Sequence, residues 1–392
     1  MTVHERILDA EYGNRLHRVQ EAMAQKAFGA LVVCDPANLF YLIGYNAWSF
    51  YTPQCVLVPA EGQPHLFARA QDAAGAAYTC ALPDDRIHGY PEELVHRPGV
   101  HPFDWISASI RTLVPVDELI GVECDTHFFS PRGYFALKRG LPGNRLVDSA
   151  ELVNWIRVVK SPHEVAQLRI AGSIVESAMR TACESVRPGR RQCDVAAEIM
   201  AAQATGTPEN GGDYPAIVPM LPTGAAAGAP HLTWTDRPFQ KGEATTIELA
   251  GAYGRYHAPL ARTVMLGEPP RRLTDIAKVI AEAMNATLAA IRPGVEVDAV
   301  HRAFDRTIRA HGLEKKSRLG YSIGIGYPPD WGERTVSVRP GEATRLQAGM
   351  ALHIIPGMWT PGFGYEMSEP VVVTDTGVER LTDLPQELTI WR

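Results

Sequence analysis

Glutamates in three stretches of the sequence are the residues best suited to chemistry. Glu248 stands in the apolar segment TTIELAG, where burial is the expected outcome, and a buried carboxylate needs a partner or a function. Glu333 follows two turn-setting prolines in YPPDWGE, and Glu366 and Glu369 stand together in GYEMSE. A carboxylate can attack an electrophilic carbon, activate a water molecule or attract a cation. Solvent exposure is the default for any single glutamate, so Glu248 carries the most weight.

The elements that position Glu248 can be read from its surroundings. IELAGAYGRYHAPLART, residues 247–263, predicts two short strands joined by a Gly-rich turn. Further upstream, KSPHEVAQLRIAG begins a helix that ends at VRPG. Ser161 is placed to cap this helix, Pro162 suits its first turn and Glu164 completes a capping box.

The same order of elements occurs twice in the second part of the chain. A long amphipathic helix ends in RPG, and a second one follows, CDVAAEIMAAQ in the first unit and DAVHRAFDRTIRAHG in the second. Gly-rich β segments follow each pair. The matching order favours an internal duplication over the chance recurrence of a common helix stop. It predicts a pseudo-symmetric domain with a curved sheet under two helix pairs and a site between the halves.

The first part of the chain alternates helix and strand signals. Apolar residues recur at helical spacing from Leu16 to Ala27, and ALVVCD, QCVLVP, PHLFAR and LIGVEC follow as strands. This alternation predicts a layered α/β domain that ends near residue 158. A length of 392 residues suits two domains, which we expect at 1–158 and 159–392.

Composition restricts the partners and the compartment. The net charge of −6 and the lack of a Lys/Arg stripe argue against nucleic acid as a partner. No apolar run approaches the roughly 20 residues of a membrane helix, and no signal peptide is apparent. We expect buried thiols in a reducing compartment, the cytoplasm, because no cysteines form a CxxC pair. The cysteines are Cys34, Cys55, Cys80, Cys124, Cys183 and Cys193.

Residues 159–392 resemble the pita-bread family, which includes aminopeptidase P, prolidase, methionine aminopeptidase and creatinase. The two-domain layout resembles its creatinase and prolidase branch. The resemblance implies an α/β N-terminal domain and an α+β pita-bread domain with pseudo-two-fold symmetry and a curved antiparallel sheet. Peptidases of this family hold two metal ions on two aspartates, a histidine and two glutamates. The corresponding positions here are Glu248, Pro259, Tyr321, Ile355 and Ser368.

These substitutions argue against a metallopeptidase. Proline and isoleucine cannot coordinate a metal, and tyrosine and serine are poor ligands for the divalent ions used there. We therefore expect neither a metal nor another cofactor. His231 falls where the family's peptidases and creatinase keep an active-site histidine, and the match implies a catalytic role for it.

Longer stretches resemble the ectoine-hydrolase branch of the family, over nearly the whole chain. They include DPANLFYLIGYNAWSFYTPQCVLV, GYPEELVHRPGVHPFDW, RYHAPLART, GYSIGIGYPPDWGERT and IIPGMW…GYEMSE. The resemblance implies hydrolysis of ectoine, a cyclic amidinium that carries a carboxylate, to acetylated diaminobutyrate. We expect Glu248 to act as nucleophile or as base, Glu333 and Glu366 to hold the ring N–H groups, and His231 to move protons.

Aromatic residues are expected to line the pocket and to contact the amidinium, at ~1–2 kcal/mol for a desolvated cation–π pair. For each aromatic residue alone, ordinary core packing is an equally good interpretation. Arg262 and Arg334 could bind the substrate carboxylate. In creatinase-like relatives the first domain reaches the partner's cleft, which implies a homodimer. The substrate-binding candidates are Trp48, Phe50, Tyr51, Tyr256, His257, Arg262, Tyr321, Trp331, Trp359 and Glu369.

Three alternatives remain open at this level. The substrate could be 5-hydroxyectoine or another cyclic amidine. It could also be a linear guanidino compound, as for creatinase, because both kinds combine a planar cation with a carboxylate. A pita-bread protein that binds a peptide or a partner without catalysis is the third. His231 and the three carboxylates favour an enzyme.

Overall fold

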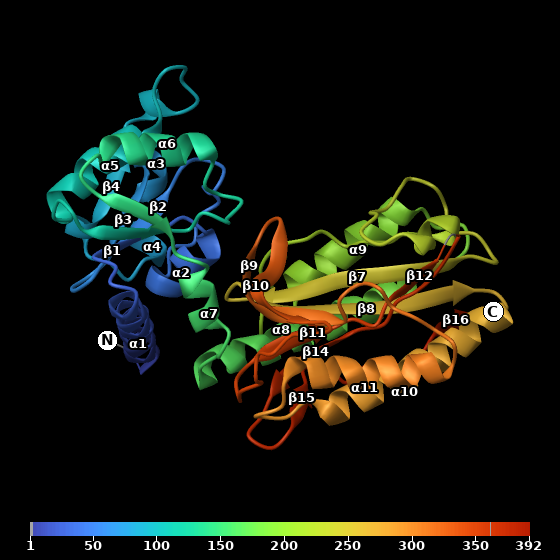
Figure 1. The fold of residues 1–392 in the computed structure, drawn as a ribbon. Helices are drawn as coiled ribbons and strands as arrows, with labels where there is room; N and C mark the ends of the chain where they lie inside the picture. The colour runs from blue at the N-terminus through green and yellow to red at the C-terminus, as the bar shows by residue number, and fades with distance from the viewer. Residues whose placement is uncertain (1–2, 361) are drawn as a thin grey trace. The chain divides into compact units, whose positions relative to one another are not determined.

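The computed structural model describes residues 3–360 and 362–392 (Figure 1). The chain forms two compact units, Met1–Arg157 and Val158–Arg392, which are described separately. Among the described residues, no helix has the length and apolar character that crossing a membrane requires.

The first unit is built on a six-stranded mixed sheet in the order β4–β3–β2–β1–β5–β6. β1 pairs antiparallel with β2 and parallel with β5, so the four strands expected from the sequence lie side by side at its centre. The strands are β1 (Ala30–Val33), β2 (Cys55–Pro59), β3 (His65–Arg69), β4 (Ile87–Tyr90), β5 (Leu119–Val122) and β6 (Arg145–Asp148).

Helices pack on this sheet around one apolar core. Val32, Leu57, Phe67 and Ile106 are among its fully buried members. The first helix ends before Ala27, whose positive φ of 54° lies outside the helical region, so the predicted helix was too long at this end. The helices are α1 (Val3–Gln25), α2 (Pro36–Ile43), α3 (Ala70–Ala73), α4 (Ala76–Thr79), α5 (Pro102–Leu113), α6 (Pro131–Gly140) and α7 (Leu152–Arg157).

The second unit contains an eight-stranded curved sheet and a separate two-stranded β12–β13 ribbon. Its main path runs β15–β14–β11–β9–β8–β16, with β10 paired to β9 and β7 paired to β8. These pairs are antiparallel, which confirms the predicted curved antiparallel sheet; the one exception among the described strands is the edge strand β16, which pairs parallel with β8. The strands are β7 (Ala244–Tyr253), β8 (Tyr256–Leu266), β9 (Gly320–Tyr327), β10 (Asp330–Val338), β11 (Ala351–Ile354), β12 (Met358–Thr360), β13 (Phe363–Tyr365), β14 (Glu369–Val373), β15 (Val378–Arg380) and β16 (Thr389–Trp391).

Two helix pairs accompany the sheet, as the repeat predicted. They are α8 (Pro162–Ser185) with α9 (Gln192–Thr205), and α10 (Arg271–Ala290) with α11 (Val297–Ala310). The predicted capping box at the start of α8 is confirmed: the Glu164 amide donates to Ser161 Oγ, and the Ser161 amide donates to the Glu164 carboxylate. Figure 1 shows α8 running alongside the β7–β8 hairpin, where Gly251 permits the close approach, because a Cβ there would lie 2.2 Å from the carbonyl oxygen of Ala171.

Each helix pair leads to a hairpin, β7–β8 after the first and β9–β10 after the second. The strands of the first hairpin span ten and eleven residues, so they are longer than the short strands predicted. Gly254 and Arg255 form its turn, both with positive φ, which suits the twist of a two-residue hairpin. The unbroken register places Glu248 opposite Ala261, in the middle of the hairpin.

All six cysteines are free thiols, but they are not all buried. Cys34 and Cys55 lie in the core of the first unit, whereas Cys124 is exposed. The expectation of buried thiols is therefore wrong for Cys124 and only partly met by the half-buried Cys80, Cys183 and Cys193.

Candidate active site

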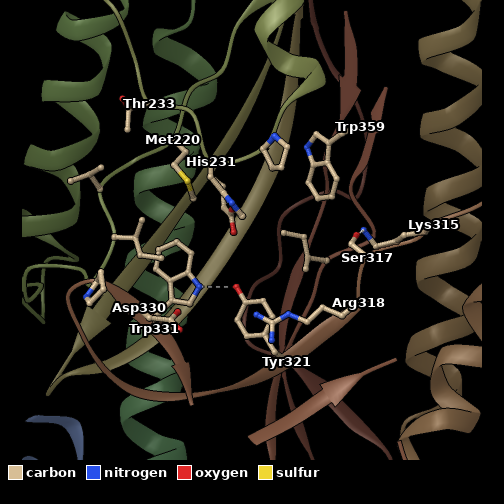
Figure 2. Close-up of a pocket in the computed structure, with 16 residues that line it drawn as sticks. Met220, His231, Thr233, Lys315, Ser317, Arg318, Tyr321, Asp330, Trp331 and Trp359 are labelled. Carbon is tan, nitrogen blue, oxygen red and sulfur yellow. Dashed lines mark hydrogen bonds between the residues drawn. The ribbon is translucent and has the colours of Figure 1, made fainter. Parts of the chain in front are cut away.

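A cavity of about 520 Å³ lies within the second unit (Figure 2). Segments far apart in the sequence form it: the loop before β7, β7 itself, the segment that leads into β9, the β9–β10 turn and β12. Its lining residues are Ile217, Val218, Met220, Pro230, His231, Thr233, Glu248, Lys315, Ser317, Arg318, Tyr321, Pro329, Asp330, Trp331, Ile355 and Trp359. The structure thus brings together five of the residues predicted to be catalytic or to bind the substrate: His231, Glu248, Tyr321, Trp331 and Trp359.

Glu248 is held in β7 by two backbone hydrogen bonds to Met220. Its amide donates to the Met220 carbonyl at 3.0 Å and its carbonyl accepts from the Met220 amide at 2.8 Å, while Ala261 faces it across the hairpin. The residue is only 5% exposed. Burial raises the pKa of the Glu248 carboxyl well above its usual range, and repulsion from Glu366 adds to this effect.

Glu366 is the second buried carboxylate at this site, although it does not line the cavity wall. Its amide donates to Thr263 Oγ1 and its carbonyl accepts from the same hydroxyl, both at 2.8 Å, which anchors it to β8. Its Oε1 atom is buried and has no hydrogen-bond partner among the described residues. Burial raises the pKa of Glu366 to about 7, against an opposing attraction from Lys315.

Cationic side chains occupy another edge of the cavity. Lys315 Nζ donates to Ser317 Oγ and to the Gly357 carbonyl, both at 2.8 Å, and lies 4.6 Å from the centre of the Trp359 ring. Burial lowers the pKa of Lys315 to about 8, opposed by the charge of Glu366. Arg318 is exposed and stacks 4.3 Å above the Tyr321 ring. Figure 2 shows Lys315, Ser317 and Arg318 grouped on the side of the cavity away from Thr233.

Tyr321 lies where three side chains meet. Its hydroxyl accepts a hydrogen bond from Trp331 Nε1 at 2.8 Å, drawn in Figure 2, and lies 3.0 Å from His353 Nδ1. Burial, followed by the nearby charge of Glu248, raises the pKa of the Tyr321 phenol well above its usual value. Trp331 also packs in one apolar cluster with Met220 and Ala250.

His231 lines the cavity from the loop before β7 and has a positive φ of 64°. Residues other than glycine rarely adopt this left-handed conformation, although histidine, asparagine and aspartate tolerate it best. The cost of such a backbone is of order 1 kcal/mol or more, and strained residues concentrate at functional sites. The geometry therefore agrees with a role in the cavity, and the exposed ring can meet a ligand there.

Glu333, Arg262 and Glu369 are not brought to the cavity. Glu333 pairs with Lys160 at 2.7 Å, and both side chains are 1% exposed. Arg262 donates to Glu369 at 2.7 Å, and the same glutamate also accepts from Arg380. Because buried charges need partners, these carboxylates are occupied by structural pairs, and the expectation that they meet the substrate is not supported.

Tyr256 and His257 also have structural partners. Tyr256 donates to Glu164 at 2.7 Å. His257 is fully buried; its Nε2 accepts from the Ala216 amide and its Nδ1 lies 2.8 Å from the Arg255 carbonyl. Burial and the charge of Arg255 lower the pKa of His257 to about 3. Neither residue lines the cavity.

The three aromatic residues expected from the N-terminal part, Trp48, Phe50 and Tyr51, belong to the first unit. Trp48 and Tyr51 are each 58% exposed, and Arg69 donates to the Tyr51 hydroxyl at 2.8 Å. The rings of Trp48 and Phe50 are tilted by 49° to each other, with centres 5.0 Å apart. Their role at a substrate site stays a prediction, as does that of Arg334 in β10.

Sequence reasoning missed Lys315, Arg318 and His353. The first two stand in LEKKSRLGYSIGIG, directly ahead of Tyr321, so this basic cluster could have been found. His353 gave no such signal, because a single histidine in the apolar strand ALHI resembles any core histidine.

The two units and the cavity of the second define a class of protein. Residues 15–159 match the Creatinase/Prolidase N-terminal domain, and residues 166–375 match metallopeptidase family M24. The chain belongs to metallopeptidase family M24, in the two-domain form of creatinase and prolidase, and it is a hydrolase.

Two similar proteins cover essentially the whole chain. It is 42% identical to the ectoine hydrolase of Halomonas elongata over 97% of both chains. It is also 42% identical to the uncharacterized hydrolase/peptidase y4tM of Sinorhizobium fredii, over 97% of this chain and 98% of that protein.

Solved structures share the fold. Dipeptidase PepE from Mycobacterium ulcerans aligns with a TM-score of 0.81 at 25% identity, over 97% of this chain and 98% of its own. The prolidase from Thermococcus sibiricus aligns with a TM-score of 0.82 at 20% identity, over 97% of this chain and 99% of its own. At such identity the prolidase supports the fold alone.

The residues present do not fit the metal pair of the family's peptidases. At the five positions where the resemblance places ligands, only Glu248 offers a suitable donor. Ile355 lines the cavity with an apolar side chain, and the Ser368 hydroxyl is engaged by the Ala261 amide and His353. In residues 3–360 and 362–392, no three His, Cys, Asp or Glu side chains are arranged to hold a metal ion.

Proposed function

We propose that this protein is a metal-independent hydrolase that opens the cyclic amidine ring of ectoine and releases acetylated L-2,4-diaminobutyrate. The observation that carries the proposal is the pair of buried carboxyls, Glu248 and Glu366, beside a cavity without a metal ligand set. The 42% identity to an ectoine hydrolase over the whole chain supports this choice of substrate.

The charges at the site match such a substrate. Ectoine carries a planar amidinium and one carboxylate. Glu248 and Glu366 provide negative charge for the ring, and Lys315 and Arg318 provide positive charge for the carboxylate. Trp359 offers an aromatic face, and its buried Nε1–H has no partner among the described residues, so it is available as a donor.

Substrate binding itself prepares Glu248 for reaction. Since its pKa is raised by burial and by Glu366, the carboxyl holds a proton more readily than a free glutamate does. An amidinium in the cavity favours the charged form, because opposite charges attract strongly where water is excluded. The carboxylate then attacks the amidinium carbon, or takes a proton from a water molecule that does so.

The remaining steps need one water molecule, and both of its protons pass to the departing nitrogen, which leaves as an ammonium group. Water supplies the oxygen that becomes the acetamide carbonyl, and one ring C–N bond breaks. We propose that His231, which lines the same cavity, delivers a proton to the departing amine. Glu366 balances the charge of the ring N–H groups. Glu333 forms a buried ion pair with Lys160, and we assign it no contact with the substrate.

We also infer a cytoplasmic homodimer without nucleic-acid partners. The free cysteines support a reducing compartment, and the exposed Trp48 and Tyr51 support an interface on the first unit. Light scattering of the purified protein measures the oligomeric state directly. A mass of one chain would contradict the dimer.

The test of the function is ring opening by chelator-treated protein. Purified protein is incubated with ectoine after exhaustive treatment with a chelator, metal content is measured, and the product is followed by ¹H NMR. Parallel reactions contain 5-hydroxyectoine, creatine and an Xaa-Pro dipeptide. We expect acetylated diaminobutyrate from ectoine at an undiminished rate. Turnover only after a metal is returned, or only of creatine or the dipeptide, would refute the proposal.

A further inference from the structure

His353 links two of the positions at which the family's metal ligands are expected. It lies on β11, between β9 and β14, and is fully buried. Its Nε2 atom is 2.7 Å from Ser368 Oγ, and its Nδ1 atom is 3.0 Å from the Tyr321 hydroxyl. A continuous chain of hydrogen bonds therefore runs from the sheet to the wall of the cavity.

Two donors at the ends of this chain have a fixed direction. The Ala261 amide donates to Ser368 Oγ at 2.7 Å, and Trp331 Nε1 donates to the Tyr321 hydroxyl at 2.8 Å. A backbone amide and an indole N–H can donate a hydrogen bond but cannot accept one, so the donor and acceptor roles in these two bonds are fixed. Burial lowers the pKa of His353 to about 3, so near neutral pH the ring carries one proton and one lone pair.

Which ring nitrogen of His353 carries the proton determines the directions in which the hydroxyl protons of Ser368 and Tyr321 point. With the proton on Nε2, His353 donates to Ser368, whose own hydroxyl proton then needs a further acceptor. Ser368 is fully buried, and the described part of the chain offers Oγ no partner besides Ala261 and His353. A buried donor without a partner destabilises the folded protein.

The other arrangement satisfies Ser368 and both ring nitrogens of His353. Ser368 donates to Nε2, Nδ1–H donates to the Tyr321 hydroxyl, and that oxygen accepts from both His353 and Trp331. The one proton left over is that of Tyr321, which lines the cavity and can meet solvent or a ligand. In this arrangement the donors of Ala261, Ser368, His353 and Trp331 are all paired.

We infer that His353 is a positioning residue that carries its proton on Nδ1 and directs the Tyr321 hydroxyl into the cavity as a hydrogen-bond donor. The consequence for catalysis rests on the proposed function. When the amidinium carbon is attacked, an adjoining ring nitrogen gains a lone pair, and Tyr321 donates to it. The two hydrogen bonds that Tyr321 accepts hold this donor in place before the substrate arrives.

The tautomer can be measured without any assumption about the substrate. Protein labelled with ¹⁵N-histidine is studied by long-range ¹H–¹⁵N correlation, and the His353 signals are assigned by their loss in His353→Asn. We expect a protonated Nδ1 and an unprotonated Nε2. A proton on Nε2, or on both nitrogens, would overturn the inference. This result is independent of whether ectoine is the substrate.

A double-mutant cycle tests the consequence for turnover. Tyr321→Phe and Ser368→Ala should each lower kcat for ectoine about 10- to 100-fold with little change in KM, and Ser368→Thr should restore most of the loss. The double variant should be no worse than Tyr321→Phe, because Ser368 acts only through the tyrosine. Effects that multiply would show that Ser368 has a separate role and would overturn the inference. Inactive wild-type protein with the expected tautomer would instead refute the proposed function alone.

Discussion

Glu248 and Glu366 lie buried at one site, and the charge of Glu366 adds to burial in raising the pKa of Glu248. They come from different parts of the chain, β7 and the segment just before β14, and are brought together by the β8 residues Ala261 and Thr263. Two buried carboxyls this close bind a proton or another cation readily. This property has consequences for activity and for stability.

Replacement of Glu248 by glutamine should abolish the chemistry. We expect Glu248→Gln to lower kcat by roughly 10²- to 10⁴-fold or more, because an amide neither attacks carbon nor accepts the proton of a water molecule under these conditions. Glu209→Gln, at an exposed position, is the matched control and should retain wild-type kcat. Mass spectrometry of acid-quenched wild-type protein separates the two roles, since only a nucleophile yields an adduct on the peptide with Glu248.

The stability of the empty protein should depend on the same carboxyls. The folded-state pKa of Glu366, about 7, exceeds its usual 4.5, so between these values the folded state holds a proton that the unfolded state has lost. This proton contributes on the order of 3 kcal/mol to the free energy of unfolding. The contribution is fully present below pH 4.5 and is lost as pH rises to about 7. Glu366→Gln should therefore raise Tm at pH 8 relative to wild type and change it little at pH 4.5.

Differential scanning fluorimetry at both pH values, without ligand, measures this difference. Glu209→Gln again serves as the control, because it lies at the surface. An equal shift of Tm at the two pH values would mean that the stability of the protein does not depend on the titration of Glu366.

His231 combines a left-handed backbone with a place in the cavity, and two variants separate these features. His231→Asn keeps a residue that tolerates positive φ but removes the base, whereas His231→Ala removes both. We expect both to lose about 10²- to 10⁴-fold in kcat, with a lower Tm only for the alanine variant. Retained turnover in His231→Asn would mean that His231 is needed only for its backbone conformation and not for proton transfer.

Arg318 should recognise the carboxylate of the substrate. Arg318→Gln is expected to raise KM for ectoine by about 10- to 100-fold, because a hydrogen bond to a charged group contributes about this much to binding. The carboxamide of ectoine, which lacks the negative charge, should bind wild type and variant alike. Arg339→Gln removes an exposed arginine outside the cavity and should leave KM unchanged. An equal loss for ectoine and its carboxamide would contradict this role.

Glu333 should matter for stability more than for turnover, because it forms a buried pair with Lys160. Lys160→Met leaves the glutamate without its lysine and should cost about 3–5 kcal/mol in the free energy of unfolding. Adding Glu333→Gln should recover part of that loss. Urea unfolding gives these free energies, and the kcat of folded Glu333→Gln should stay within a few-fold of wild type. A loss as deep as that of Glu248→Gln would place Glu333 in the chemistry instead.

Several features of this protein follow from the sequence alone. Local signals predicted the capped helix at Ser161 and the repeated helix–helix–hairpin order, because capping and periodicity depend on neighbours a few residues apart. The apolar setting of Glu248 predicted its burial for the same reason. The fold could be recognised because its elements are repeated and regular.

Which polar groups face the cavity was decided by the tertiary structure. Glu333 and Glu366 look alike in sequence, yet Glu333 forms an ion pair with Lys160, whereas the charge of Glu366 acts on Glu248. The neighbours of a buried charge come from distant segments of the chain. His353 could not be distinguished from a core histidine until β11 lay between β9 and β14. β11 is not joined by a hairpin turn to β9 or to β14, so no turn geometry fixes which of their residues face each other.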